Sequence, residues 1–571
     1  MKFSFSKIII SACLALSIMS CQKELEQQFA DPEKPNPPTD EKFPGMFTAA
    51  LYGWKLYVGD YGEWYYQLNS GTGVPGYSQI AQRYVTSRYT WYTTYDDLTT
   101  GNGFSDAALV DYFKTFFVNT RNYGAMLDLY ATTPAELKNE AMLYIKLTTI
   151  VRDYGALKLV DLVNAIPFTD AWKGTSGVFF PKYDDPAKTY EFVMGELKSI
   201  ADTLPTLYNQ LSSSEKGDFT RQDFAAKGDI NMWVQYCSML RIRYAVRIAG
   251  VNPTLAKQVL AEELAKPRLS ADMVWQMPHV ANPLSGGTWE RGWYENAFAT
   301  FVPNTILKRM NFGTNAYEPG IDDPRLPVIA MPTKWKDYRG ASMNADAQEA
   351  AYVAGDRYYA YADNLTSSLA SNAMSMYNHA TFHRNTQPGN WMTLGEMDLL
   401  LAEIALKGLG TTGKTAAEHI EDAVKHSTAY WYWVNGLSTY EPTSVLHPAK
   451  PLAAEVDIYA ATVRAKFTAA ATEEDKMEIL MQQKYIHMNL PGAYELFTEL
   501  RRTRHPKLEP FTLGGKVMKP VAERIRYPNS ELQTNTDNYL KVKAEDNYIT
   551  PIFWVPADKR GVTYYRNDYN Y

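Results

Sequence analysis

Residues 227–250 read KGDINMWVQYCSMLRIRYAVRIAG, a stretch with a strong helical pattern. Its apolar side chains recur at spacings of three and four residues, as on one face of an α-helix. They are Ile230, Trp233, Val234, Cys237, Leu240, Tyr244, Ala245 and Ile248. Asp229 is placed to cap the first turn, and Gly250 follows the last. The pattern predicts a long helix with Cys237 as a small core residue rather than a reactive thiol.

The same periodicity recurs along the chain and predicts a mainly α fold. Further helices are expected at Asp106–Tyr130, Pro134–Asp161, Asp185–Leu204, Thr415–Trp431, Ala453–Ala470 and Thr472–Leu490. Thr393 and Glu396 have the spacing of a capping box before another apolar run, in which Glu403 and Lys407 are placed to pair at i,i+4. Long helices joined by short connections favour antiparallel pairs stacked into a solenoid-like body.

We expect one large body over residues 43–571, because no second linker interrupts the pattern. Residues 278–389 differ from the rest, since they are rich in Gly, Asn, Pro and aromatic residues and poor in long apolar periodicity. A large irregular insertion in a compact body is usually functional.

The N-terminus has the pattern of a secretory signal. Lys2 and Lys7 precede an apolar run from Ile8 to Met19, which is too short to span a bilayer. The run ends in Ile18-Met19-Ser20-Cys21, which resembles a bacterial lipobox. Residues 1–20 are therefore predicted to be a lipoprotein signal peptide, with Cys21 as the lipid attachment point. The alternative is an ordinary signal peptide followed by a coincidental cysteine.

Residues 21–42 are predicted to be a lipidated N-terminus and a stalk. Four prolines and alternating charges between Phe29 and Lys42 favour an extended spacer. The residues just after Cys21, Lys23-Glu24-Leu25-Glu26, resemble the acidic tag that sends Bacteroidetes lipoproteins to the outer face of the outer membrane. With Cys13 removed and Cys21 acylated, only Cys237 remains, so no internal disulfide is expected. The net charge of −6 argues against a nucleic-acid partner.

Three motifs that could carry chemistry are better explained as structure. Residues 408–415, GLGTTGKT, match a phosphate-binding loop, but a helix rather than a strand is predicted before them, so we expect a helix end and a turn. His379 and His383 lack the glutamate of a zinc motif and lie in a predicted loop or strand. Asp322-Asp323-Pro324-Arg325 resembles a turn with a local ion pair rather than a glycosidase pair.

Aromatic clusters in polar loops point to ligand binding. Indole and phenol rings can stack on the C–H faces of sugars while polar neighbours bond hydroxyls. The candidate stacking residues are Trp91, Trp289, Trp293, Tyr294 and Trp335. The alternative is that these rings pack back on the body.

The chain as a whole resembles the SusD/RagB-type outer-membrane lipoproteins of Bacteroidetes, over most of its mature length. Besides the lipobox, the likeness rests on short segments in a fixed order. They are Tyr154-Gly155, Ile166-Pro167-Phe168, Lys227-Gly228-Asp229, Ser238 to Arg247, Asp323 to Leu326, Thr393 to Gly408, Gln483-Lys484-Tyr485, Tyr494 to Pro506, Arg526-Tyr527-Pro528, Glu531 and Asn535.

The resemblance implies tetratricopeptide-like helix pairs with loop-rich insertions and no catalytic activity. It implies a lid on a SusC-like TonB-dependent barrel, at the outer membrane, that delivers glycans or, in some members, peptides. Arg501 and Arg502 match the family's C-terminal pattern and are expected to be structural anchors. A secreted helical glycoside hydrolase is the remaining alternative. No cofactor is expected, and structural calcium in an acidic loop has no motif to support it.

Overall fold

The computed structural model describes residues 42–55, 106–276, 302–312, 315–340, 342, 344–360, 373–382, 388–438, 443–489, 491–509, 512–513, 516–517 and 523–562. Internal contacts divide the chain into two units, Met1–Lys42 and Phe43–Tyr571, and the elements below belong to the second. No helix among those described has the length and apolar character needed to cross a lipid bilayer.

Helices dominate the described part of the chain, which confirms the predicted mainly α fold. The longer helices are α2 (Phe43–Lys55), α5 (Asp106–Thr132), α6 (Lys138–Val163), α7 (Pro186–Asn209), α8 (Ser213–Gln222), α9 (Ile230–Ile248), α10 (Pro253–Leu264), α17 (Leu394–Leu406), α18 (Ala416–Gly436), α19 (Ala453–Ala469), α20 (Glu473–Met488) and α21 (Ala493–Thr503). Two short helices, α22 (Ser530–Thr534) and α23 (Thr536–Val542), follow.

Within the described part of residues 278–389 the helices have only 4 to 9 residues, as the composition of that segment predicts. They are α12 (Asn304–Leu307), α13 (Leu326–Ile329), α14 (Ala345–Val353), α15 (Arg357–Ala360) and α16 (His379–Phe382). The strands form two-stranded antiparallel sheets. These pair β1 (Met273–Gln276) with β4 (Pro388–Met392), β2 (Ala330–Met331) with β3 (Met376–Tyr377), and β5 (Thr512–Leu513) with β6 (Lys516–Val517).

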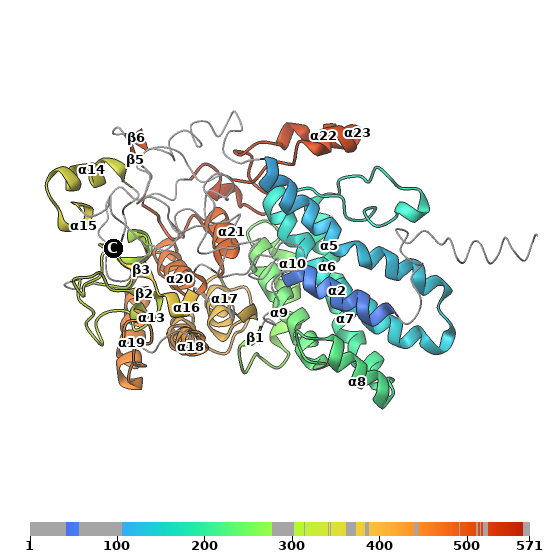
Figure 1. Ribbon diagram of the computed structural model, residues 1–571, viewed down its shortest axis with the longest axis horizontal. Coiled ribbons are helices and arrows are strands. Elements are labelled where there is room, and N and C mark those ends of the chain that lie inside the picture. The colour runs from blue at the N-terminus through green and yellow to red at the C-terminus, as the bar shows by residue number, and fades with distance from the viewer. Residues whose placement is uncertain are drawn as a thin grey trace, which may run out of the picture. The chain divides into compact units, whose positions relative to one another are not determined.

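The long helices pack in two groups (Figure 1). In the first group α6 contacts α2, α5 and α7, and α9 contacts α7 and α10. In the second group α17 contacts α18 and α20, and α19 also packs against α18 and α20. Helices α9 and α17 touch and so join the groups. Connections as short as residues 249–252 and 470–472 force successive helices to reverse direction, which produces the predicted antiparallel pairs.

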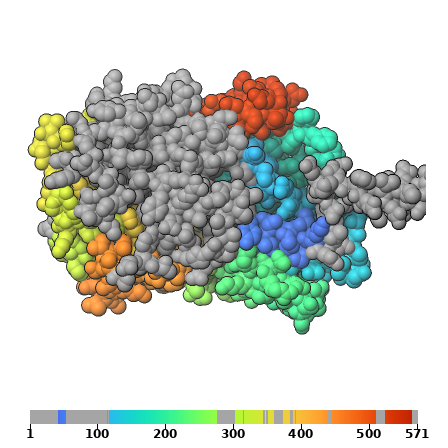
Figure 2. Space-filling model, in the orientation of Figure 1, coloured from blue at the N-terminus to red at the C-terminus, as the bar shows by residue number. Residues whose placement is uncertain are grey.

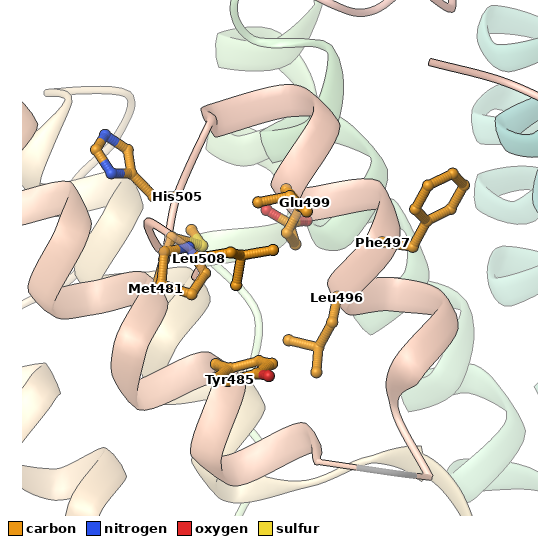
Figure 3. A pocket seen from close by; sticks show the side chains of 9 residues that line it. Met481, Tyr485, Leu496, Phe497, Glu499, His505 and Leu508 are labelled. Carbon is orange, nitrogen blue, oxygen red and sulfur yellow. The ribbon is translucent and has the colours of Figure 1, made fainter. Parts of the chain in front are cut away.

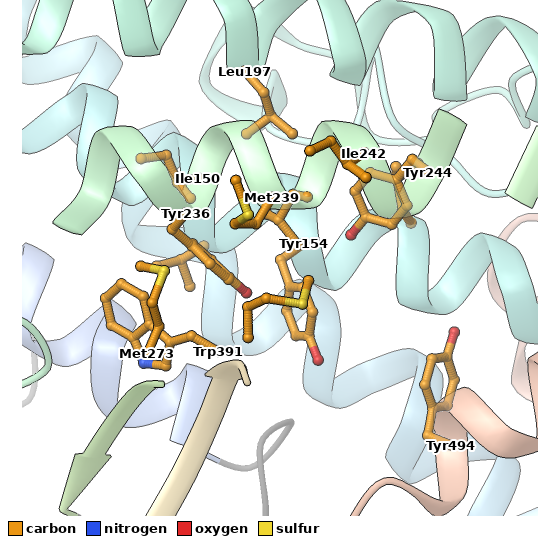
Figure 4. Packing of buried hydrophobic residues seen from close by; sticks show 14 of the residues in the cluster. Ile150, Tyr154, Leu197, Tyr236, Met239, Ile242, Tyr244, Met273, Trp391 and Tyr494 are labelled. Carbon is orange, nitrogen blue, oxygen red and sulfur yellow. The ribbon is translucent and has the colours of Figure 1, made fainter. Parts of the chain in front are cut away.

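Helix α9 lies at the centre of the core. Its bounds agree with the prediction, and the Asp229 side chain accepts the N–H groups of Asn231 and Met232 at its start. Figure 4 shows Tyr236 and Met239 of α9 among side chains of α6 and β4. Burial extends beyond the predicted apolar stripe, because every α9 residue from Tyr236 to Ile248 is buried. A helix covered on all sides belongs to the interior.

Buried ion pairs connect α9 to both helix groups. Arg243 donates two hydrogen bonds to Glu396 of α17, at 2.8 and 2.9 Å. Arg247 pairs with Asp161 of α6 at 2.6 Å and with Glu495 of α21. Arg502 of α21 binds both oxygens of Glu403. We call these pairs, with Lys484 and Glu499, the buried ion-pair network, and it joins α6, α9, α17, α20 and α21.

The network also explains two wrong predictions on α17. Thr393 caps the helix by accepting the N–H of Glu396 at 3.2 Å, but the Glu396 carboxylate does not return to Thr393 and binds Arg243 instead. Similarly, Glu403 binds Arg502 rather than Lys407, whose ammonium lies 3.7 Å from Glu473. A buried guanidinium requires a carboxylate, and a charge-assisted pair outweighs a local surface bond.

Residues 408–415 form the predicted helix end and turn. Gly408 adopts a positive φ of 59° after α17, and the N–H groups of Gly408 and Leu409 bond the carbonyls of Ala405 and Ile404. This is a Schellman motif, which favours glycine at that position. Thr415 then caps α18 in a full capping box with Glu418.

Two helices, α7 and α18, extend five residues beyond their predicted ends. Helix α7 continues through Pro205 to Asn209, although a proline removes one backbone bond. Tyr208 packs on Phe219 and the Leu207 carbonyl accepts a bond from Asn139, so tertiary contacts hold the last turn. Helix α18 likewise runs to Gly436, where Val434 and Asn435 are buried.

Gly250 follows α9 as predicted, but its backbone does not have the left-handed φ of a helix-ending glycine. Its role is close packing, since a Cβ there would lie 2.5 Å from Pro556. We expect Gly250→Ala to lower the free energy of unfolding by about 1–3 kcal/mol through overpacking, measured by urea denaturation. The matched control is Gly195→Ala in α7, where nothing lies within 4 Å. This control should stabilise by about 0.5–1 kcal/mol, and equal effects of the two variants would contradict the explanation.

Candidate binding site

Trp335 lies in a tight turn between β2 and α14. The turn is closed by backbone bonds from Lys336 to Thr333 at 2.8 Å and from Thr333 to Asp337 at 2.7 Å. Lys336 adopts a positive φ of 66°, and the Thr333 hydroxyl accepts the Trp335 N–H at 3.2 Å. Such hydroxyl-to-backbone bonds stabilise turns. The turn sets the position of the Trp335 backbone, and the indole is half-buried.

Tyr358 of α15 completes an aromatic pair with Trp335. The ring centroids are 5.3 Å apart and the planes meet at 82°, an edge-to-face arrangement. The Arg357 guanidinium lies 4.8 Å from the Trp335 centroid, and the Lys334 ammonium lies 4.6 Å from it. Figure 2 shows the segment of α14 and α15 (yellow) at the molecular surface. We call Thr333, Trp335, Asp337, Arg357 and Tyr358 the Trp335 platform.

Asp337 fixes the two parts of the Trp335 platform to each other. Its carboxylate accepts hydrogen bonds from the Thr333 hydroxyl, the Tyr358 hydroxyl and Arg357. Burial opposes its ionisation, but these three donors outweigh burial and lower the pKa of Asp337. Burial and the bond to Asp337 raise the pKa of Tyr358. At pH 7 the site therefore presents a carboxylate, a guanidinium and a neutral phenol beside an indole.

This combination suits reversible binding of a polar ligand with an apolar face. The rings offer stacking surface, and the exposed Arg357 can donate hydrogen bonds to hydroxyls or carbonyls. Lys334 is exposed, so its ammonium can leave the indole face when a ligand arrives. Asp337 has both oxygens engaged by donors, which suits a positioning role rather than proton transfer.

A second concave feature is a charged cavity of about 220 Å³ where the ends of α9 and α17 meet the start of α20 and residues 556–559. Its charged lining residues are Lys407, Glu473, Glu474, Arg502, Asp558 and Lys559. Several of these charges already pair with each other, as Lys407 does with Glu473 and Lys559 with Glu474. The cavity is therefore of mixed charge, and no aromatic ring is among the described residues that line it.

A third space is too small to bind anything larger than water. It measures about 10 Å³ and lies between α20 and α21, lined mainly by apolar side chains such as Met481, Tyr485 and Leu496 (Figure 3). A void of this size holds at most one water molecule. We interpret it as a packing gap.

Of the residues predicted to stack on a ligand, only Trp335 is among those that the structure describes. Trp91, Trp289, Trp293 and Tyr294 lie outside the described residues, as does Cys21. Tyr338, which neighbours Trp335 in the sequence, is buried and only 6% exposed. The sequence reasoning missed Arg357 and Tyr358, although the run Arg357-Tyr358-Tyr359 meets the same criterion of rings beside a charged residue in a loop-rich segment.

The motifs set aside in the sequence behave as structural elements where they are described. Asp323 and Arg325 form a buried ion pair at 2.5 Å, as expected. His379 is buried, which lowers the pKa of its imidazole to about 4, while His383 lies outside the described residues. His379 begins a short helix, so the prediction of a loop or strand there was wrong. Cys237 is fully buried, as predicted for a core thiol.

Comparison with known protein families gives one family model that matches most of the chain. A family model described as SusD-like, "Susd and RagB outer membrane lipoprotein", matches residues 43–555. The chain belongs to the SusD-like family. This confirms the resemblance found in the sequence, and the family is one of outer membrane lipoproteins. A sequence search of curated proteins gave no match.

Solved structures share the SusD-like fold at low sequence identity. A chitin-binding protein superposes with a TM-score of 0.65 at 20% identity, covering 90% of this chain and 99% of its own. A chitin-binding SusD homologue from Flavobacterium johnsoniae gives 0.61 at 19% identity, covering 92% and 100%. A SusD homologue from Parabacteroides distasonis gives 0.65 at 18% identity, covering 90% and 98%. At these identities the likeness shows the fold alone.

Proposed function

We propose that this SusD-like protein captures oligosaccharide or polysaccharide at the cell surface and delivers it, as a lid, to a SusC-like TonB-dependent transporter. The observation that carries the glycan assignment is the Trp335 platform, where an indole and a phenol meet edge to face beside Arg357 and Asp337. Family membership supports the location and the transporter partner. The chitin-binding relatives with the same fold support a saccharide ligand.

The proposal includes a lipid anchor at Cys21 that holds the body at the outer face of the outer membrane, and no catalytic role. Trp91, Trp289, Trp293 and Tyr294 are proposed as further stacking residues on the basis of their sequence context. A single indole supports only one sugar ring, so a polysaccharide site requires several such rings.

Native affinity electrophoresis tests the glycan assignment. The purified chain, in mild detergent, is run through gels that contain plant, host or microbial polysaccharides, with soluble chitin oligosaccharides as competitors. Retardation by one polymer, without release of reducing ends, is the expected result. Release of reducing ends would favour an enzyme, and no retardation across the panel would contradict glycan binding.

Replacing Trp335 should weaken binding of the polymer found in this way. We expect Trp335→Ala to raise the dissociation constant by about 10- to 30-fold, because a buried aromatic anchor contributes about 2 kcal/mol to binding. The measurement is calorimetric titration, with circular dichroism to show that helix content is unchanged. Trp335→Phe keeps a stacking ring and should retain most of the affinity. Equal affinity of Trp335→Ala and the wild type would exclude the Trp335 platform as a binding site for that polymer.

The charged cavity favours a second candidate, the same lid role with a peptide or another charged solute. Both cationic and anionic side chains line this cavity of about 220 Å³, which matches a zwitterionic ligand better than a sugar. If polysaccharides fail to bind, the same titration with mixed short peptides tests this candidate. Lys559→Ala should then weaken binding, while Trp335→Ala should not.

A further inference from the structure

Three side chains that can bind a metal ion converge on the hairpin of α17 and α18. Asp398 belongs to α17, and His419 and Asp422 lie three residues apart on one face of α18. One ligand atom from each residue lies within 4.8 Å of the other two. This cluster is separate from the Trp335 platform and from the charged cavity, neither of which these residues line.

His419 carries the strongest evidence in this cluster. Its side chain is only 1% exposed, yet neither ring nitrogen has a hydrogen-bond partner among the residues that the structure describes. Buried polar groups are almost always bonded, because leaving one without a partner costs free energy. An imidazole nitrogen without a hydrogen bond can offer its lone pair to a metal ion.

The two carboxylates are held in place by neighbouring side chains. The His426 ring contacts Asp398 through Nδ1 at 2.6 Å, and the Lys414 ammonium contacts Asp422 at 2.5 Å. Contacts of this kind orient the carboxylates that bind metals in proteins. Lys414 is also a competitor, since its positive charge opposes a cation at Asp422. Its side chain is 51% exposed and can therefore move into water.

We propose that Asp398, His419 and Asp422 bind one divalent transition-metal ion, with zinc as the best match. An imidazole nitrogen with two carboxylates suits zinc, whereas calcium and magnesium prefer oxygen ligands only. Zinc bonds of about 2.0–2.2 Å place tetrahedral ligands roughly 3.4 Å apart. The ligand atoms lie within 4.8 Å of one another, and rotation of the two partly exposed carboxylates can bring them to this shorter distance. A water molecule would fill the fourth coordination position. The ion would fasten α17 to α18.

Zinc titration of the full chain tests the site. The purified wild-type protein, stripped with a chelator, is titrated with Zn²⁺ against a chromophoric competitor. We expect one ion per chain and a rise in the unfolding temperature on binding. His419→Leu and Asp422→Asn should each weaken this binding at least 100-fold. The control Asp457→Asn changes an exposed acid of α19 that pairs with Lys425, and should leave it unchanged.

Two further results separate a metal ligand from a merely structural histidine. His419→Leu should not lower the stability of the metal-free protein, because it removes a buried polar group that has no partner among the described residues. Lys414→Met should tighten zinc binding several-fold, because it removes the competing charge. The proposal is wrong if the wild type binds Zn²⁺ no more tightly than His419→Leu, or if Lys414→Met weakens binding.

Discussion

Replacing Arg502 with alanine is expected to lower the free energy of unfolding by about 3–5 kcal/mol, the cost of breaking a buried ion pair. Arg502 donates to both oxygens of Glu403 at 2.6 and 2.7 Å and also binds Glu499. Both carboxylates are buried, at 1% and 3% exposure, so the variant leaves negative charge in the interior without its main partner. Urea denaturation at pH 7 measures the loss.

An exposed arginine provides the matched control for this prediction. Arg464 pairs with Glu421 at 2.8 Å, but its side chain is 43% exposed, so Arg464→Ala should cost less than about 1 kcal/mol. The double variant Arg502→Ala, Glu403→Ala should lose less than the sum of its single changes, because it also removes a stranded carboxylate. A loss below about 1 kcal/mol for Arg502→Ala would show that the pair contributes no more than a surface contact.

Stability should also fall in acid through Glu478 of α20. Its carboxylate contacts His505 Nδ1 at 2.7 Å and accepts the Lys507 N–H at 2.8 Å, with Arg309 at 3.5 Å. Burial opposes ionisation, but the hydrogen bonds from His505 and Gln482 and the charge of Arg309 outweigh it and lower the pKa of Glu478 from 4.5 to about 2. Because the folded pKa is depressed, the carboxylate stabilises the fold above about pH 4.5 and this contribution is lost as the pH falls to about 2.

A pH series of urea denaturation curves tests this prediction. The shift in the pKa of Glu478 corresponds to about 3 kcal/mol of stability at pH 7. Glu478→Gln should be less stable than the wild type at pH 7, and the difference should narrow by about 2 kcal/mol between pH 7 and pH 3. Glu473→Gln changes a nearby glutamate whose side chain is 57% exposed, and should run parallel to the wild type. A constant difference for Glu478→Gln would contradict the assignment.

Helix positions could be predicted where the determining contacts are local. Asp229 caps α9 through its own neighbours, and the Schellman turn at Gly408 is encoded within a few residues. The last turn of α7 and the burial of Arg243 and Arg247 could not be predicted in this way. The last turn of α7 depends on Phe219 and Asn139, and the two arginines depend on Glu396 and Asp161, which other helices supply. Spacing along one helix carries no information about a carboxylate that another helix supplies.

The same distinction between local and distant contacts applies to the candidate site. Trp335 could be selected as a candidate from the sequence, since a ring beside charged residues in an irregular loop is a local signal. Its pairing with Tyr358 could not, because the turn at Lys336 and the Asp337 carboxylate bring the two rings together. His419 showed no signal in the sequence, where it reads as one more residue of an amphipathic helix. Only the packing of α17 against α18 shows that its nitrogens find no partner in the described part of the chain.

The buried ion-pair network has a consequence for how the body can move. Separating the two helix groups would require Arg243 of α9 to leave Glu396 of α17. It would also break a pair of α21, either Arg247 with Glu495 or Arg502 with Glu403, and each break would strand a charge in a dry interior. Helices packed only through apolar side chains can shift against each other by small steps. Buried ion pairs allow a single relative position of the two helices, because any shift separates the charges. We therefore expect the two helix groups to move as one rigid unit, rather than to shift against each other, when the body changes position.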